Sequence, residues 1–303
     1  MRVFVTGASG WIGSAVVPEL IGAGHQVVGL ARSDDAAERL GAAGAEVRLG
    51  TIDDLDVLRR TAADADGVIH LAFKHDLAFT GDFAGATAAD RAAIEAFGDA
   101  LAGTDRPFVI ASGLLGVAPG RVATEVDGVS VADDAAGPSM RHRNGHLTVA
   151  LAERGVRSSV LRLPPTVHGD GDNGFVAALV AIARATGVAG YVGDGSHRWP
   201  ATHRTDAARA FRLALEKAPA GSTLHAAAEQ GVRIRDVAEA MGRHLGVPVQ
   251  AVSPEDAPAH FTWLAPLIGT DSPASSTATR ALLGWQPTGP GLLEDLDRGH
   301  YFA

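Results

Sequence analysis

The sequence has no cysteine, and it has only two lysines and two tyrosines. A chain without cysteine forms no disulfide and offers no thiolate nucleophile or cysteine-bound zinc, which is typical of proteins in a reducing compartment. Long apolar runs are missing as well. The longest, residues 175–183, is too short to cross a bilayer and ends at Arg184. Since the first residues do not resemble a secretory signal, we expect a cytoplasmic protein that binds no membrane.

An excess of basic residues is also missing. Thirty-five acidic residues against 26 basic ones give a formal net charge of -9, which is the wrong sign for a broad phosphate-binding surface. We expect no nucleic-acid partner. Hydrophobic residues make up 46% of the 303 positions and charged residues 20%, so the chain can bury a full core and is neither disordered nor fibrous. The length fits one large domain or two closely packed ones.

Short apolar runs alternate with alanine-rich segments through the first half of the chain. The runs are continuous, as in strands covered on both faces, and the segments between them are long enough for crossover helices. This predicts an α/β fold with a doubly wound parallel sheet and right-handed connections. The expected strands are residues 2–6, 26–30, 46–49, 67–72, 107–112 and 156–163, and the expected helices are residues 12–23, 34–43, 54–63, 87–102 and 139–154.

The alternation of short apolar runs and alanine-rich segments ends after residue 163. We expect a loop at 164–174, helices at 175–186, 204–217 and 234–245, a strand at 222–227, a turn-rich stretch at 187–200 and an irregular one at 248–290. These elements indicate two interleaved parts. One is a core of residues 1–165, to which residues 204–228 return, and the other is a smaller C-terminal lobe of residues 166–203 and 229–303.

A glycine-rich turn joins the first expected strand to the first expected helix: Thr6-Gly7-Ala8-Ser9-Gly10-Trp11-Ile12-Gly13. A strand before and a helix after are the context that a dinucleotide-binding fingerprint requires. Gly7 permits the tight turn, Gly10 lets the backbone approach a pyrophosphate, and Gly13 lets the helix pack on the strand. The free N–H groups at the helix start favour an anion. Ser9, Trp11 and Ile12 complete the predicted phosphate-binding turn of a Rossmann sheet.

Two residues separate the first two glycines of this turn, and further motifs follow along the chain. They are Val68-Ile69-His70-Leu71-Ala72, Leu161-Arg162-Leu163-Pro164-Pro165-Thr166-Val167-His168-Gly169, Val192-Gly193-Asp194-Gly195 and Leu283-Gly284-Trp285-Gln286-Pro287. Together they resemble the extended branch of the short-chain dehydrogenase/reductase superfamily, with its NAD(P)-dependent epimerases, dehydratases and 3β-hydroxysteroid-dehydrogenase-like reductases. The resemblance implies that the core binds the cofactor and the lobe binds the substrate. It places Leu71, Ala72 and Phe73 at the nicotinamide ribose, and Pro164, Thr166 and Val167 beside the carboxamide.

The end of the second strand favours NADP(H) over NAD(H). Ala31 stands where an NAD-binding protein places a carboxylate for the ribose hydroxyls, and Arg32 and Ser33 follow it. A guanidinium fork and a hydroxyl suit a 2′-phosphate, which a carboxylate would repel. The alternative is that Arg32 is an ordinary exposed arginine. Thr51 stands where the superfamily usually has an aspartate near the adenine, so Thr51 and Ile52 are expected walls of that site.

The catalytic pair of the resembled family is missing. Active members carry Tyr-x-x-x-Lys on the fifth helix and a Ser or Thr at the end of the fifth strand. Ser112 is present, but the pair aligns with Arg141 and Gly145. Arginine stays protonated in proteins, so Arg141 can stabilise negative charge but is a poor proton donor. Ser112 is the expected residue that orients a substrate carbonyl.

Several histidines remain as candidates. His142 is the best substitute acid because histidine titrates near neutral pH, although we expect His142 and His146 to face solvent. Their i,i+4 spacing has no third ligand, so we expect no metal site. Either substrate contact or loop packing fits His168. We expect His203 and Asp206 to cap the helix at 204–217. Lys74 and His75 either line the substrate site or lie in a solvated turn.

These observations lead to three hypotheses. The first is an atypical NADPH-dependent reductase of a carbonyl, imine or activated alkene on a small hydrophobic molecule, in which Ser112 and Arg141 stabilise negative charge and His142 or water returns the proton. The second is a redox-silent NADP(H)-binding sensor, and the third an isomerase, epimerase or dehydratase that retains its cofactor. The loop at 113–138 is an expected lid, and the resemblance implies a homodimer through the fourth and fifth helices.

Overall fold

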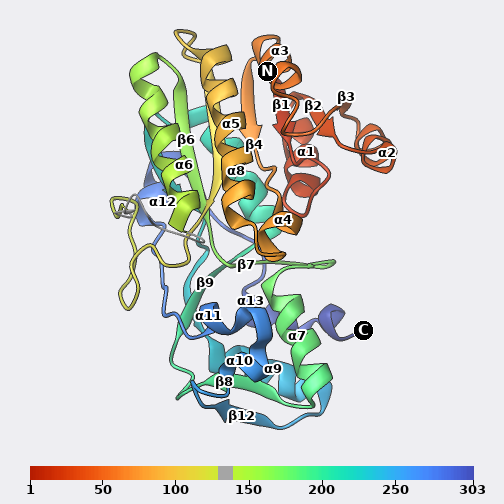
Figure 1. Ribbon diagram of the computed structural model, residues 1–303, viewed down its shortest axis with the longest axis vertical. Helices are drawn as coiled ribbons and strands as arrows, with labels where there is room; N and C mark the ends of the chain where they lie inside the picture. Colours follow the sequence, from red (N-terminus) through yellow and green to blue (C-terminus); the bar gives the residue numbers. More distant parts are fainter. Residues whose placement is uncertain (129–138) are drawn as a thin grey trace.

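The computed structural model describes residues 1–128 and 139–303 (Figure 1). Its centre is a seven-stranded sheet in the order β10-β6-β5-β4-β1-β2-β3, and every neighbouring pair in it is parallel. The strands are β1 (Arg2–Thr6), β2 (Gln26–Ala31), β3 (Glu46–Leu49), β4 (Gly67–His70), β5 (Pro107–Gly113), β6 (Arg157–Leu163) and β10 (Ser222–His225). The predicted doubly wound parallel sheet is confirmed.

Helices cover both faces of this sheet. The pair α1 and α8 packs together on one face, while α3, α5 and α6 pack side by side on the other. Each face buries its own apolar cluster, one around Leu20 and Phe211 and one around Phe4 and Phe97. The helices are α1 (Gly13–Gly22), α2 (Asp34–Ala42), α3 (Leu55–Ala63), α4 (His75–Phe79), α5 (Phe83–Leu101), α6 (Ser139–Ala150) with the 3-10 turn η1 (Leu151–Arg154), and α8 (Arg204–Lys217).

A smaller lobe lies below the carboxyl edge of the sheet (Figure 1). It holds a three-stranded sheet of β7 (Thr166–His168), β9 (Arg198–His203) and β11 (Glu229–Arg233), and a two-stranded sheet of β8 (Ala189–Val192) and β12 (Val249–Val252). Its core surrounds the fully buried Trp199 and Phe261. The remaining elements are α7 (Phe175–Thr186), α9 (Ile234–Leu245), α10 (Ala257–Phe261), η2 (Thr262–Leu264), α11 (Ala265–Ile268), α12 (Thr277–Leu283), α13 (Leu292–Asp297) and η3 (His300–Phe302).

The lobe is more regular than its sequence predicts. The stretch expected to be turn-rich, 187–200, holds β8 and the start of β9, and the stretch expected to be irregular, 248–290, holds β12 and three short helices. Prolines within or beside these elements, such as Pro200 inside β9, hide them from a reading by periodicity. The division into a cofactor-binding core and a substrate-binding lobe stays a prediction.

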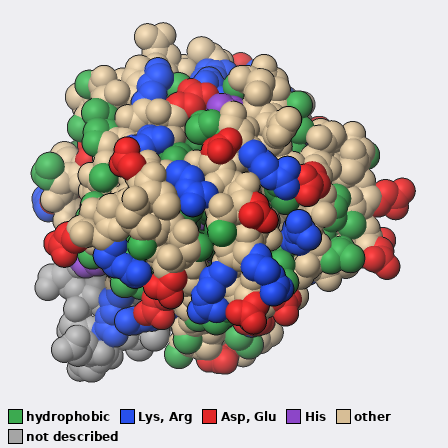
Figure 2. Space-filling view, turned by 90° about the horizontal axis from the view of Figure 1, so that it is seen from above, with side chains coloured by type: hydrophobic (Ala, Val, Ile, Leu, Met, Phe, Trp, Pro, Cys, Tyr) green, Lys and Arg blue, Asp and Glu red, His purple; other side chains and the backbone are tan. Residues whose placement is uncertain are grey.

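The molecular surface carries charge of both signs, in keeping with the mixed composition of the sequence. Acidic and basic side chains are interspersed on the face shown in Figure 2, which looks down on the top of Figure 1. The described residues include no helix with both the length and the apolar character needed to span a membrane.

Candidate functional site

The glycine-rich turn has no room for side chains. A Cβ atom on Gly13 would lie 2.1 Å from the carbonyl oxygen of Gly7, and one on Gly7 would lie 2.7 Å from the backbone nitrogen of Ala72. Gly7 also has a φ of 65°, which disfavours other residues. A Cβ on Gly10 would meet a single described atom within 4 Å, the Gly7 oxygen at 3.2 Å. The backbone is therefore packed on the β4 side and open at Gly10.

The start of α1 has no side-chain cap. Its N-cap residue, Ile12, makes no side-chain hydrogen bond, and no acidic residue stands in the first turn. The positive end of the helix dipole is left without an internal anion there. Beside it the indole N–H of Trp11 donates to the Val167 carbonyl at 2.9 Å, and the Arg204 guanidinium covers the Trp11 ring at 4.5 Å. Trp11 thus ties the glycine turn to β7 and α8.

The end of β2 carries the residues that are expected to contact the adenosine ribose. Ala31 is fully buried, whereas the Arg32 side chain is 78% exposed and lies 3.9 Å from Asp76. The Ser33 hydroxyl caps α2 by accepting from Ala36 N–H. Across the turn after β3, the backbone N–H and the hydroxyl of Thr51 both bond to Asp54, and Ile52 is buried. Arg32 is free enough in this group to reach a ligand.

Buried polar side chains form a series of hydrogen bonds from β1 to α6, next to Leu71, Ala72 and Phe73. The Thr6 hydroxyl lies 2.6 Å from His70 Nδ1, and it accepts from Ala72 N–H. His70 Nε2 lies 3.2 Å from Asp90 Oδ1. The donors and acceptors are satisfied together when Thr6 donates to Nδ1 and the Nε2–H of a neutral His70 donates to Asp90.

The same series of hydrogen bonds continues to helix α6. The Asn144 amide donates to Asp90 Oδ2 at 2.6 Å and to the Thr87 carbonyl at 3.1 Å. Burial raises the pKa of Asp90, but the hydrogen bonds from His70 and Asn144 and the charge of Arg141 outweigh it and hold this pKa below its usual value. Sequence reasoning missed Asp90 and Asn144. The available signal was a carboxylate on the buried, alanine-rich face of α5.

Helix α6 brings Arg141 and Gly145 to the carboxyl edge of the sheet. A Cβ atom on Gly145 would lie 4.0 Å from Ser112 Oγ, in ordinary contact, so the position aligned with the family's lysine faces the predicted catalytic serine. Ser112 itself is buried at the end of β5. One turn earlier on α6, the Arg141 guanidinium stacks 4.2 Å from the centre of the Phe73 ring. The structure thus brings Gly145 to Ser112 and Arg141 to Phe73.

Arg141 is the charged group of this site. Burial lowers the pKa of its guanidinium, and the charge of Asp90 raises it in part. Arginine nevertheless stays protonated under these conditions. Its Nε is shielded from solvent and has no hydrogen-bond partner among the described residues. The site therefore holds a guanidinium group with an unused hydrogen-bond donor.

His142 does not match its expected role. The expectation that both helix histidines face solvent holds for His146 and is wrong for His142, which is 7% exposed. Burial first, and then the charges of Arg162 and Arg141, lower the pKa of His142 to about 4. At neutral pH the ring is uncharged and has no imidazolium proton to give. His142 is therefore a poor general acid.

The other predicted residues lie around this centre. Lys74 is bound to Asp53 at 2.7 Å, and the His75 ring packs on Phe73 at 5.0 Å. Pro164 is buried, and the Thr166 hydroxyl donates to the Pro200 carbonyl. His203 caps α8 as expected, by accepting from Thr205 N–H. Within residues 1–128 and 139–303 no group of three or more histidines and carboxylates is arranged to hold a metal ion.

The expected lid, 113–138, is described as far as residue 128. This part is tied to the C-terminal lobe, since Gly120 N–H donates to the Asp271 carbonyl and Ala123 N–H donates to the Pro273 carbonyl. Leu114 and Ala123 join a small apolar cluster with Ala274. Residues 129–138 of the expected lid lie outside the described part of the chain.

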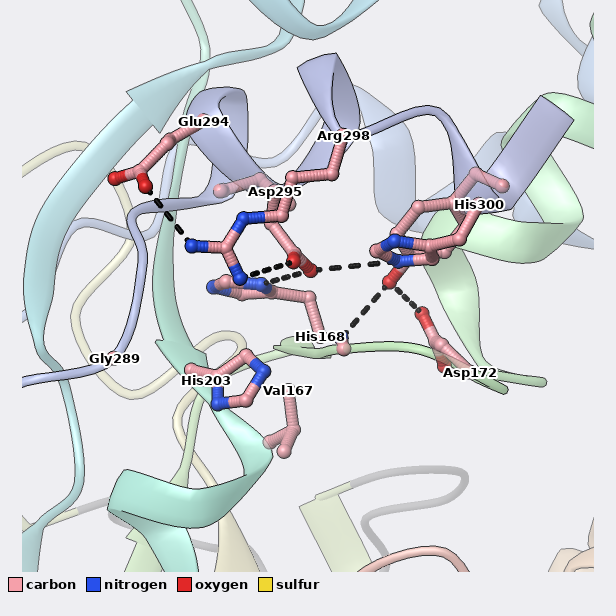
Figure 3. Close-up of polar contacts among 12 residues, drawn as sticks. Val167, His168, Asp172, His203, Gly289, Glu294, Asp295, Arg298 and His300 are labelled. Carbon is pink, nitrogen blue, oxygen red and sulfur yellow. Dashed lines mark hydrogen bonds and ion pairs between the residues drawn. The ribbon is translucent and has the colours of Figure 1, made fainter.

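His168 belongs to a buried network between β7 and the C-terminus (Figure 3). Its side chain is 0% exposed, and Nδ1 lies 2.9 Å from Asp295 Oδ2. Nearby, the Tyr301 hydroxyl donates to Asp172 at 2.9 Å and accepts from Gly169 N–H. Of the two roles considered for His168, the structure favours loop packing. The network fixes the segment after Val167. The carbonyl of Val167 is the one that accepts from Trp11 in the glycine turn.

We expect Asp295→Asn to lower the free energy of unfolding by about 1–3 kcal/mol, because the charged acceptor of a buried histidine becomes a neutral amide. Chemical denaturation measures this change. The control is Asp297→Asn, two residues along, whose side chain is 51% exposed and bonds Arg243 and His244; an exposed pair of this kind contributes about 1 kcal/mol or less. Equal effects of the two substitutions would contradict a structural role for the buried pair.

These features define a class of protein. A parallel sheet with β1 at the point where the strand order reverses, a glycine turn without room for Cβ atoms, and an uncapped helix after it form the dinucleotide-binding half of a Rossmann fold. The site lies at the carboxyl edge, between this half and the smaller lobe.

Comparison with known proteins gives the family. The model of the NAD dependent epimerase/dehydratase family matches residues 3–95. An uncharacterized protein of Schizosaccharomyces pombe is 46% identical over 303 residues, covering 100% of both chains, and one of Saccharomyces cerevisiae is 43% identical, covering 99% of both. The chain therefore belongs to the NAD dependent epimerase/dehydratase family.

Solved structures show the same fold. A UDP-glucose 4-epimerase of Thermotoga maritima, solved with UDP-glucose, aligns with a TM-score of 0.75 and 21% identity over 100% of this chain and 98% of that one. A dTDP-glucose 4,6-dehydratase of Bacillus anthracis, in complex with NAD, aligns with a TM-score of 0.75 and 14% identity over 99% of this chain and 95% of that one. At these identities the likeness concerns the fold.

Proposed function

We propose that the protein is an NADP(H)-dependent reductase of a carbonyl, imine or activated double bond on a small, largely apolar molecule. The observation that carries this proposal is the glycine turn. Its backbone is closed on the β4 side and open at Gly10, where an added Cβ would stand in space that is otherwise free of described atoms. Such a turn, followed by an uncapped helix start, fits a pyrophosphate. A structural neighbour that is solved with NAD supports the same class of cofactor.

The preference for NADP(H) rests on the end of β2. Ala31 offers no carboxylate to the ribose hydroxyls, and the exposed Arg32 offers a planar fork to a 2′-phosphate. The 3.9 Å approach to Asp76 is long, and both side chains are about three-quarters exposed, 78% and 75%. Pairs of this kind contribute little, so releasing Arg32 to a ligand costs little.

The chemistry combines the cofactor with three groups of this chain. When bound, a nicotinamide supplies a hydride to a carbon atom of the substrate. Ser112 donates a hydrogen bond to the substrate oxygen or nitrogen, and Arg141 stabilises the negative charge that develops there. The buried series of hydrogen bonds from Thr6 to Asn144 positions α6 and so Arg141. The proton comes from water, because His142 is uncharged at neutral pH.

Loss of the tyrosine does not exclude turnover. General acid catalysis contributes about 10²- to 10⁴-fold, or about 3–5 kcal/mol of barrier, whereas positioning two reactants supplies about 7–11 kcal/mol. A site that keeps the positioning and an electrostatic group retains most of the rate enhancement.

The test is a pair of measurements on the purified protein. Calorimetry should give a smaller Kd for NADP⁺ than for NAD⁺, and absorbance at the NADPH band should fall when carbonyl, imine and enone substrates are added. Absence of NADP⁺ binding rejects the proposal. Binding without oxidation of NADPH by any compound favours the second candidate, a redox-silent NADP(H) sensor, which the absence of the Tyr-x-x-x-Lys pair supports.

We expect Arg32→Ala to weaken NADP⁺ binding about 10-fold or more while changing NAD⁺ binding little, because only NADP⁺ carries the 2′-phosphate. Arg39→Ala, on α2 of the same surface region, is the charge-matched control and should leave both affinities unchanged. Titration calorimetry at one fixed salt concentration gives the two dissociation constants. An equal loss for both cofactors would count against this role of Arg32.

A further inference from the structure

Arg141 lacks a counter-ion in the described part of the chain. No carboxylate of residues 1–128 or 139–303 forms an ion pair with its guanidinium within 4.0 Å, and Nε is sealed from solvent without a partner. The Phe73 ring at 4.2 Å and the more distant charge of Asp90 offset part of the cost of burying this cation. A partly buried cation that is paired only in part is costly to keep, and an anionic ligand would complete it.

The same cation stands on the helix that passes beside the predicted catalytic serine. Arg141 stands four residues before Gly145, which is about 6 Å along the axis of α6. The Cβ position of Gly145 is 4.0 Å from Ser112 Oγ. The edge of the sheet therefore offers a hydroxyl donor on β5 and a planar guanidinium fork on α6, two elements that pack against each other. Together they suit a molecule that carries both a carbonyl and an anionic group.

We propose that Arg141 binds a carboxylate of the substrate, and that the substrate is an oxo acid whose carbonyl is reduced. This rests on the proposed reductase function, names its substrate class and refines the role of Arg141: the guanidinium hydrogen-bonds the carboxylate, while Ser112 bonds the carbonyl oxygen. The guanidinium fork matches a planar carboxylate with two parallel hydrogen bonds. A neutral carbonyl compound would leave Arg141 without its anion. Phe73 lies against the guanidinium and gives the apolar part of the substrate a surface to contact.

The reaction balances as a two-electron reduction. The carbonyl carbon gains a hydride from the reduced nicotinamide and forms a C–H bond, while the π electron pair of the C=O bond moves onto the oxygen. That oxygen takes a proton from water. The products are a hydroxy acid, the oxidised nicotinamide and hydroxide, which takes up a proton from the buffer.

Equilibrium binding to the full-length protein tests the proposal without turnover. The probes are oxamate and 2-oxo-4-phenylbutanoate, each compared with its neutral amide, titrated by calorimetry into protein saturated with NADP⁺ and into cofactor-free protein. The wild type should bind the acids more tightly than the amides. Arg141→Met should weaken acid binding about 30-fold or more, Arg141→Lys should weaken it less, and none of the variants should change the Kd of NADP⁺. Arg154→Met removes an exposed arginine that pairs with Asp99, and should bind like the wild type.

Thermal unfolding gives an independent readout. Arg141→Met should melt at the wild-type temperature or above, because it removes a partly buried, incompletely paired cation and keeps an unbranched side chain of similar reach. A much lower melting temperature would overturn the inference by revealing an internal partner. Equal binding of acids and amides by the wild type, or equal acid binding by Arg141→Met and the wild type, would also overturn it. Failure of the wild type to bind NADP⁺ rejects the reductase function instead, and the acid–amide comparison in cofactor-free protein still decides the role of Arg141.

Discussion

Gly10→Ala is expected to weaken NADP⁺ binding about 100-fold, equivalent to about 2.7 kcal/mol, while the protein stays folded. The added methyl group would occupy the open side of the turn, where the pyrophosphate must approach the backbone. It would meet one described atom, the Gly7 oxygen at 3.2 Å, which a small shift relieves. Gly13→Ala is a less specific test, because its Cβ would lie 2.1 Å from the same oxygen and disrupt the turn itself. Calorimetry and the melting temperature together measure the effect.

Gly22 supplies the matched control for this prediction. It lies at the end of the same helix, α1, and an added Cβ would meet no described atom within 4 Å. Gly22→Ala should leave cofactor binding unchanged and raise stability by up to about 1 kcal/mol, since alanine is the better helix former. Unchanged NADP⁺ affinity in Gly10→Ala would remove the main support for the proposed cofactor site.

Asp90→Ala is expected to lower the free energy of unfolding by about 3–5 kcal/mol. The Asp90 carboxylate is 4% exposed and accepts from both His70 and Asn144, so its removal leaves two buried donors without an acceptor. It also removes the negative charge that raises the pKa of Arg141. Urea denaturation at pH 7 measures the loss. Asp99→Ala, on the exposed side of α5, removes an ion pair with Arg154 and should cost about 1 kcal/mol or less.

The pH dependence gives a second measurement for Asp90. The native environment holds the pKa of Asp90 below its ordinary value, so the carboxylate contributes stability above the unfolded-state pKa of about 3.9. That contribution is lost as pH falls from about 4 through the lowered native value. The wild type should therefore lose more stability than Asp90→Asn in this acidic range. Parallel curves for the two proteins would show that Asp90 is not ionised in the native state.

Sequence reasoning predicted the parts of the fold that are local. Strands such as β1 and β5 contain continuous apolar runs, and α7, α8 and α9 have the expected bounds. The small sheets of the lobe were missed because they are short and join distant segments: Thr166 pairs with Ala201, and Glu229 pairs with the same residue from the other side. No pattern within a few neighbouring residues encodes such a pairing.

The candidate site likewise has a local part, which the sequence predicted, and a part formed by distant residues, which it did not. The glycine turn is contiguous, so Gly7, Gly10 and Gly13 could be assigned from their spacing. The contacts of Asp90 reach 20 residues back to His70 and 54 residues forward to Asn144, and no local signal joins them. The burial of His142 was equally hidden, because α6 has a weakly apolar sequence, Ser-Met-Arg-His-Arg-Asn-Gly-His, on which the inward face is hard to recognise.

The position of Trp11 has a practical consequence. Trp199 and Trp285 are fully buried, and Trp263 lies far along the chain in the lobe, whereas the Trp11 indole stands in the glycine turn, under Arg204 and against the Val167 carbonyl. A chromophore at that junction senses both what enters the turn and how β7 and α8 sit against it. The chain thus carries its own fluorescent reporter, and a variant that keeps Trp11 while replacing the other three tryptophans would let occupancy be followed by emission, without any attached dye.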